Sequence, residues 1–157
     1  MKLKKYKPYI LSILITLAIG LLAGIVTYRG MPAYEQLIKP PLTPPSAAFP
    51  IVWTILYILM GISAAMIWES TDRNRDNALS IYVLQLLFNA IWSVLFFGFK
   101  SYLFSFIWLV LLWFMILIMI IRFYRIKPLA GLIQIPYLLW VTFAGYLNFM
   151  VWQLNRG

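Results

Sequence analysis

The sequence contains no cysteine and no histidine, and only 11% of its 157 residues are charged. Without thiols and imidazoles the chain cannot form disulfides, and thiolate chemistry, most zinc and copper sites and histidine-ligated haem are excluded. We therefore predict no metal site and no required cofactor.

Charged residues are also absent from five long apolar runs. Proton-coupled transporters and pumps usually place ionisable groups at membrane depth, so this absence argues against ion-coupled transport. It also removes the acid–base pairs and activated nucleophiles on which most enzyme mechanisms depend. We predict no conventional catalytic residue, and any chemistry would depend on tryptophan, tyrosine or a ligand.

Hydrophobic residues make up 64% of the sequence, whereas a soluble domain is roughly half apolar. Each run is long enough to cross a bilayer, which takes about 20 residues of helix. Backbone groups in lipid must bond within their own segment, so the runs are predicted to be helices. We expect an all-α integral membrane protein, a five-transmembrane-helix bundle in one domain over residues 1–157. The spans lie near residues 8–27, 50–68, 78–99, 101–121 and 128–152, with a bend in the last at Pro136.

The net charge of +9 does not indicate nucleic-acid binding, because the basic residues lie at the ends of the spans. The larger set belongs to the N-terminus and to the second and fourth loops: Lys2, Lys4, Lys5, Lys7, Arg73, Arg75, Arg122, Arg125 and Lys127. The opposite set is Arg29, Lys39, Lys100 and Arg156. By the positive-inside rule, the N-terminus is predicted to be cytoplasmic and the C-terminus outside, in a bacterial plasma membrane.

A proline-rich segment precedes the second apolar run. Its prolines are Pro40, Pro41, Pro44, Pro45 and Pro50. Proline fixes φ and removes a backbone donor, so the first loop, residues 28–49, is predicted to be irregular but stiff. Trp53 and Tyr57 follow directly in the second run. We therefore predict that the loop caps a pocket lined by aromatic residues.

Three of the predicted helices carry stripes of aromatic, small and amide side chains at three- and four-residue spacing, which places each stripe on one helix face. The stripes are Trp53, Tyr57, Met60, Gly61, Ala64 and Trp68 in the second helix, Tyr82, Gln85, Asn89, Trp92, Ser93 and Phe96 in the third, and Tyr137, Trp140, Ala144, Asn148 and Trp152 in the fifth. Ordinary helix packing would explain any one stripe. Binding pockets are mostly apolar with a few polar groups, so the three stripes together favour a pocket.

Gly20 and Gly24 in the first apolar run form a GxxxG pair. This motif lets two helices approach closely and often supports association. Two interpretations remain open, a homodimer interface or packing against another helix of the same chain.

Three groups of motifs cover nearly the whole chain in a familiar order. They comprise Tyr34, Leu37, Lys39, Pro40, Pro44, Pro45, Phe49, Val52, Trp53, Leu56, Tyr57, Met60 and Gly61, then Gln85, Asn89, Trp92, Ser93, Phe96 and Phe97, then Pro136, Tyr137, Trp140, Phe143, Ala144, Leu147, Asn148, Trp152 and Asn155. This arrangement resembles the translocator protein family, also called the tryptophan-rich sensory protein or peripheral-type benzodiazepine receptor (TspO/MBR) family.

The resemblance implies a five-helix bundle, often dimeric, with a pocket open toward the first loop. Family members bind tetrapyrroles such as protoporphyrin IX and haem, and some bind cholesterol or synthetic ligands. Carried over by position, the pocket residues would be Tyr34, Pro44, Trp53, Asn89, Trp92, Trp140, Ala144 and Leu147, to which the stripes add Tyr57 and Gln85. The expected function is a membrane receptor or carrier of porphyrin or another hydrophobic small molecule, with a sensing or scavenging role.

Two alternatives remain. Family tryptophans equivalent to Trp53 and Trp140 are implicated in light-dependent porphyrin breakdown, which would make the chain an enzyme. The other alternative is a sterol or small-molecule transporter.

The chain departs from the family pattern in two places. Leu42 stands where the family usually has tryptophan, which removes an aromatic ring near the loop. The proposed cholesterol motif needs a tyrosine followed by a lysine or arginine, but Phe149 takes the tyrosine position and Gln153 follows Trp152. Sterol therefore ranks below porphyrin as the expected ligand.

Overall fold

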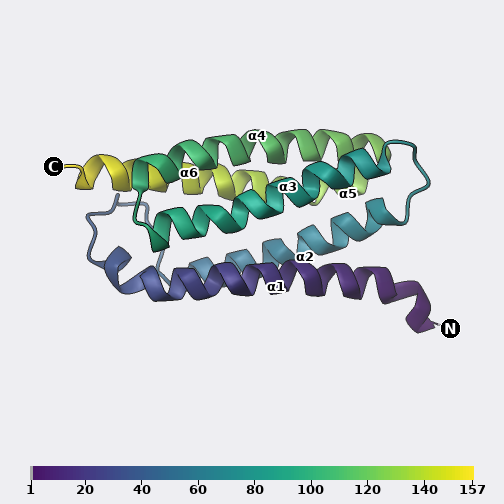
Figure 1. Ribbon diagram of the computed structural model, residues 1–157, viewed down its shortest axis with the longest axis horizontal. Helices are drawn as coiled ribbons and strands as arrows, with labels where there is room; N and C mark the ends of the chain where they lie inside the picture. The colour runs from purple at the N-terminus through teal and green to yellow at the C-terminus, as the bar shows by residue number, and fades with distance from the viewer. Residues whose placement is uncertain (1) are drawn as a thin grey trace.

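Five long helical segments form from the five apolar runs in the computed structural model, which describes residues 2–157 (Figure 1). The elements are α1 (Lys2–Glu35), α2 (Ala48–Trp68), α3 (Arg75–Ser93), the π-helix η1 (Val94–Gly98), α4 (Tyr102–Ile126), α5 (Pro128–Leu132) and α6 (Ile135–Asn155). With η1 counted with α3 and α5 with α6, five segments of the described chain are long and apolar enough to cross a membrane. The predicted all-α bundle of five spans is confirmed.

The first helix is longer than predicted. It continues through Pro32 and ends at Glu35, so Tyr34 lies on the helix and not in the first loop. The Nζ of Lys39 donates hydrogen bonds to the carbonyl oxygens of Tyr34 and Glu35. These bonds satisfy acceptors that the end of a helix leaves unpaired. The irregular part of the first loop is therefore shorter, residues 36–47, and is called the lid segment below.

The fifth span is broken before Pro136 and not bent at it. Ile133 and Gln134 leave the helix between α5 and α6, and Pro136 lies in the first turn of α6. A proline is tolerated there because the N–H groups of a first helical turn have no intrahelical partner. The predicted interruption of the fifth helix is therefore found directly before Pro136, as a break between two helices and not as a bend at the proline.

The bundle has two chemically different ends. The basic end carries the N-terminus, the loop of residues 69–74 and the junction of α4 with α5, and the lid end carries the lid segment and the C-terminus (Figure 1). The larger set of basic residues recognised in the sequence therefore gathers at one end. Between the ends, α1 packs along α2 and α3, and α4 lies between α3 and α6.

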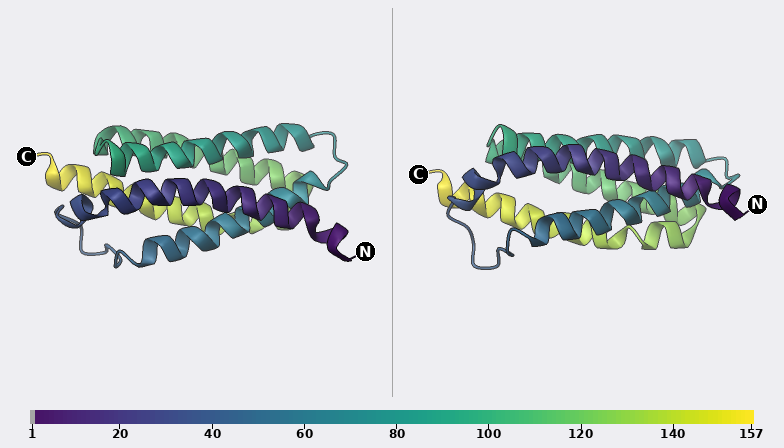
Figure 2. Two further views of the ribbon diagram at one scale, coloured as in Figure 1. Left: turned by 60° about the horizontal axis from the view of Figure 1, so that its bottom comes forward. Right: turned by 90° about the horizontal axis from the view of Figure 1, so that it is seen from below.

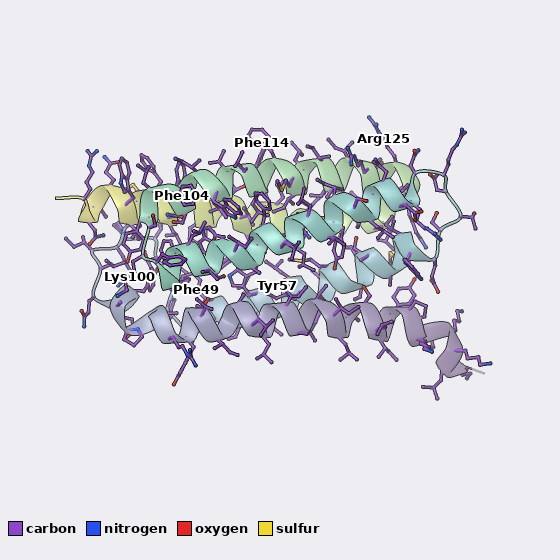
Figure 3. The ribbon with its side chains drawn as sticks, viewed as in Figure 1. Phe49, Tyr57, Lys100, Phe104, Phe114 and Arg125 are labelled. Carbon is purple, nitrogen blue, oxygen red and sulfur yellow. The ribbon has the colours of Figure 1, made fainter. Side chains whose placement is uncertain are left out.

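Apolar side chains cover the outside of the bundle and polar ones lie inside. Leu21 and Phe114 are exposed, whereas Gln85, Asn89 and Asn148 are buried. Figure 3 shows Phe114 pointing away from the helices. This distribution suits a surface in contact with lipid, because polar groups at membrane depth need partners within the protein.

The second helix begins well inside the bundle. Figure 2 shows the lid segment passing beside the bundle and entering α2 short of the end of α1. The ring of Phe49, in the first turn of α2, lies 6.1 Å from that of Trp140, whereas Ile38 bonds to Asn155 at the far end of α6. About 15 residues of α6, roughly 22 Å of helix, separate these two levels. The late start of α2 leaves room for a cavity in the lid half of the bundle.

Candidate ligand-binding cavity

A cavity of about 770 Å³ occupies the lid half of the bundle. This volume lies within the range of small-molecule sites, roughly 300–1,000 Å³. Its walls come from α1, the start of α2, the end of α3 with η1, and α6. The aromatic residues among its walls are Tyr28, Tyr34, Phe49, Trp53, Tyr57, Trp92, Phe96 and Phe97. Figure 3 places Phe49 and Tyr57 between α1 and α3 in that view.

The π-helix η1 supplies two neighbouring aromatic rings to the same wall. Consecutive residues of an α-helix differ by about 100° in direction, but the wider π turn leaves Phe96 and Phe97 both buried and both lining the cavity. Trp92 stacks on Phe96 with ring centroids 5.4 Å apart. Tyr34 of α1 lies 5.9 Å from Phe96 and 5.7 Å from Phe97. These rings form one continuous aromatic wall.

A chain of buried hydrogen bonds holds the floor of the cavity. Tyr57 OH donates to Asn89 Oδ1 over 2.6 Å, and Asn89 Nδ2 donates to Tyr137 OH over 2.8 Å. Tyr137 OH donates in turn to Gln85 Oε1 over 2.7 Å. The chain fixes the ring of Tyr57, which lines the cavity and lies 5.7 Å from the ring of Trp53.

Asn148 lines the cavity and joins three helices. Its Oδ1 accepts hydrogen bonds from Trp92 Nε1 at 3.0 Å and from Ser105 Oγ at 3.2 Å. Its Nδ2 donates to the backbone oxygen of Tyr102 at 2.8 Å. Because these groups are already engaged, the cavity relies mainly on shape and aromatic contact to hold a ligand.

The lid segment is fixed to the end of α6 by one side chain. Asn155 accepts a hydrogen bond from the Ile38 N–H at 3.0 Å and donates one to the Ile38 carbonyl at 2.8 Å. Its Nδ2 also donates to the Val151 carbonyl. Asn155 was not predicted as a site residue, because periodicity carries no signal for an amide that pairs with backbone 117 positions away.

The cavity reaches the outside between α1 and α2. Leu21, Gly24 and Tyr28 of α1 and Thr54 of α2 line the cavity and are also exposed. On a bundle with an apolar surface this side faces lipid. A hydrophobic molecule dissolved in the bilayer could reach the aromatic wall without crossing the lid segment.

Comparison with known proteins decides the family. The model of the TspO/MBR family matches residues 12–153. This chain belongs to the TspO/MBR family. It is 40% identical over 152 residues to the tryptophan-rich protein TspO of Chlorobaculum tepidum, covering 92% of this chain and 94% of that protein. It is 34% identical to the tryptophan-rich sensory protein of Cereibacter sphaeroides, over 78% and 76% of the two chains. It is 31% identical to the translocator protein of Homo sapiens, over 96% and 93%.

Six of the ten pocket residues expected from the TspO/MBR resemblance and the stripes line the cavity: Tyr34, Trp53, Tyr57, Trp92, Ala144 and Leu147. Gln85 and Asn89 do not line it and instead hold its floor from below. Trp140 lines a separate crevice of about 420 Å³ between α2 and α6. Pro44 lies in the lid segment beside Ser46 and Ala47, which do line the cavity.

The two departures from the TspO/MBR pattern differ in their relation to the site. The side chain of Leu42 is 68% exposed and is not part of the cavity wall. A tryptophan at this position would therefore extend the outer face of the lid segment. Phe149 and Gln153 also lie outside the cavity wall.

The GxxxG pair of this TspO/MBR chain has two different surroundings. A Cβ added at Gly20 would lie 2.5 Å from the Tyr57 ring, so Gly20 permits close packing of α1 on α2. A Cβ added at Gly24 would meet no atom within 4 Å. Gly24 borders the opening of the cavity. A homodimer through this pair stays a prediction.

Replacing Asn155 with alanine is expected to free the lid segment. The bonds to both backbone groups of Ile38 are lost, and each contributes about 0.5–1.5 kcal/mol. Amide hydrogen exchange of residues 36–39 should therefore accelerate about tenfold or more, as measured by mass spectrometry on the detergent-solubilised protein. The exposed Gln153→Ala serves as control. Equal exchange in both variants would mean that other contacts hold the lid segment.

Proposed function

We propose that the protein is a membrane receptor or carrier that binds tetrapyrroles, protoporphyrin IX and haem, in the aromatic cavity, with a sensing or scavenging role. The observation that carries the proposal is the continuous wall of Tyr34, Trp92, Phe96 and Phe97, in a cavity that Trp53 also lines. A flat macrocycle suits offset stacking on such rings, which contributes about 0.5–1.5 kcal/mol per pair beyond burial.

The ligand would be held by its faces and not through a metal. The chain has no histidine or cysteine, which are common side-chain ligands of haem iron, and we propose that a haem stacks on the aromatic wall as the metal-free porphyrin does. No cofactor is required for this binding.

The carboxylates of a porphyrin would need a partner at the mouth of the cavity. Lys39 already donates to the carbonyl oxygens at the end of α1. Arg29 is exposed on α1 next to Tyr28, which lines the cavity. We therefore assign Arg29 as the cation that meets a ligand carboxylate.

The proposed setting is a bacterial plasma membrane. The basic end would be cytoplasmic, because basic loops favour that side, and the lid end would lie outside. The lipid bilayer then surrounds the opening between α1 and α2 and delivers hydrophobic ligands to it. A homodimer through α1 remains part of this proposal.

Substitution of Trp53 tests the cavity assignment. Trp53→Leu removes a ring from the wall and should raise the Kd for protoporphyrin IX about tenfold, the equivalent of about 1.4 kcal/mol. Trp140→Phe should change the Kd less than twofold, because Trp140 faces the crevice between α2 and α6. Titration followed by the Soret band of the porphyrin measures both.

The control for this titration is Trp68→Phe, because Trp68 is exposed at the basic end. Equal affinity in Trp53→Leu and the parent protein would refute the cavity as the porphyrin site. Saturable binding of a sterol in place of porphyrin would favour the sterol alternative, and gradient-dependent uptake into proteoliposomes would favour a transporter.

Light-dependent porphyrin breakdown is the second candidate. The ring of Trp53 forms part of the cavity wall and lies 6.2 Å from that of Tyr137, so an oxidisable indole would adjoin the bound macrocycle. Illumination of the complex should then bleach the Soret band and give a new product. Bleaching no faster than in a protein-free control would eliminate this activity.

A further inference from the structure

Four polar atoms in the basic half of the bundle have no hydrogen-bond partner within residues 2–157. They are Tyr82 OH, Gln85 Nε2, and both Nε2 and Oε1 of Gln134. Gln85 and Gln134 have no exposed surface, and Tyr82 is 7% exposed. Roughly 90% or more of buried polar groups in proteins have a partner, so four such atoms together need an explanation. Trp140 Nε1 is also unpaired but borders the crevice between α2 and α6.

The three side chains lie at similar depths in the bundle, on α3 and at the start of α6. Tyr82 and Gln85 are three residues apart on α3, and Gln134 precedes Tyr137 by three residues at the start of α6. The two helices meet where Tyr137 OH donates to Gln85 Oε1 over 2.7 Å. Because α3 and α6 run in the same direction, Tyr82 and Gln134 both lie about one turn nearer the basic end.

We propose that Tyr82, Gln85 and Gln134 bind buried water. Their atoms include amide N–H donors, an amide oxygen and a hydroxyl, and a buried water both donates and accepts, with about three hydrogen bonds. A metal cation would be repelled by the amide donors, and an anion would find no positive charge in this group. An apolar molecule would leave all four atoms unpaired.

The water site extends the hydrogen-bond chain beneath the cavity. Gln85 already links through Tyr137 and Asn89 to Tyr57 at the cavity floor. Water on Gln85 Nε2 would continue this chain to Gln134 at the break between α5 and α6. None of the water-binding side chains lines the ligand cavity, so the proposal does not depend on the proposed porphyrin binding.

Two substitutions test the proposal by the direction in which they change the Tm. Gln134→Leu and Tyr82→Phe remove groups that hold water, so each should lower the Tm by about 2–4 °C. If the atoms are unpaired in the folded protein, the same substitutions remove a buried polar group without breaking a hydrogen bond, and they raise the Tm. An unchanged or higher Tm in both variants overturns the proposal. Tyr82→Phe deletes a single oxygen and keeps the test valid if Gln134→Leu does not fold.

The matched controls are Gln153→Leu and Tyr124→Phe, whose parent side chains are exposed; both should keep the parent Tm. A crystal structure grown from lipid at a resolution that shows ordered water provides the direct measurement. Density within hydrogen-bond distance of the Gln134 amide supports the proposal. A direct bond of Gln134 to Tyr82 or Gln85, without such density, refutes it. Porphyrin affinity should stay within twofold of the parent in all variants, which separates this test from that of the cavity.

Discussion

Replacing Asn148 with leucine is expected to lower the Tm by about 5–15 °C. The substitution keeps the number and branching of side-chain heavy atoms but leaves Trp92 Nε1 without its acceptor. It also removes one partner each from Ser105 and the Tyr102 carbonyl. An unsatisfied buried group costs about 1–3 kcal/mol, so the total loss is about 2–4 kcal/mol. Differential scanning fluorimetry in detergent measures the change.

The same variant is expected to lose ligand affinity as well as stability. Trp92 forms part of the aromatic wall, and Asn148 holds its indole. Ser105→Ala is the graded control, since it removes one bond to Asn148 and leaves Trp92 paired. A Tm for Asn148→Leu equal to that of Ser105→Ala would show that Asn148 does not organise the three helices.

Leucine at Gly30 and leucine at Gly24 are expected to act in opposite ways. A Cβ at Gly30 would lie 2.6 Å from the backbone oxygen of Phe97 and 2.8 Å from its Cβ, so α1 would be pushed away from η1. Overpacking of this kind costs about 1–3 kcal/mol. A Cβ added at Gly24 would meet no atom within 4 Å. Replacing a glycine inside a helix by another residue stabilises the helix by up to about 1 kcal/mol.

We therefore expect a lower Tm for Gly30→Leu and an equal or higher Tm for Gly24→Leu. Because Gly24 borders the opening between α1 and α2, Gly24→Leu should also slow porphyrin association without unfolding the protein, as stopped-flow fluorescence would show. A lower Tm for Gly24→Leu together with loss of a dimer would instead assign Gly24 to a subunit interface.

The spans could be predicted from the sequence because backbone N–H and C=O groups in lipid must form hydrogen bonds within the protein. A run of about 20 apolar residues in a membrane forms a helix whatever its side chains do. The ends of several helices were not predicted, since they depend on particular side chains, although the predicted end of the second span at residue 68 agrees with α2. The Nζ of Lys39 donates hydrogen bonds to the last carbonyl oxygens of α1 and so stabilises the helix as far as Glu35.

The spacing of residues along the helices predicted several of the faces that line the cavity, but not how deep in the bundle the cavity lies. Spacing of three and four residues placed Trp92 and Ala144 on inward faces, and both line the cavity. Asn89 belongs to the same stripes but lies beneath Tyr57 at the cavity floor, whereas Trp140 lies level with Phe49 and faces the crevice between α2 and α6. The depth depends on where α2 begins, and periodicity within a helix cannot report that position.

The hydrogen bonds between Ile38 and Asn155 can form only late in the synthesis of the chain. The two residues are 117 positions apart, and the second lies at the end of the fifth span. The ribosome therefore releases the lid segment long before its partner emerges. The lid segment can be fixed only after all five spans have been made, so in a partly synthesised chain the lid end of the cavity is held by no bond to α6.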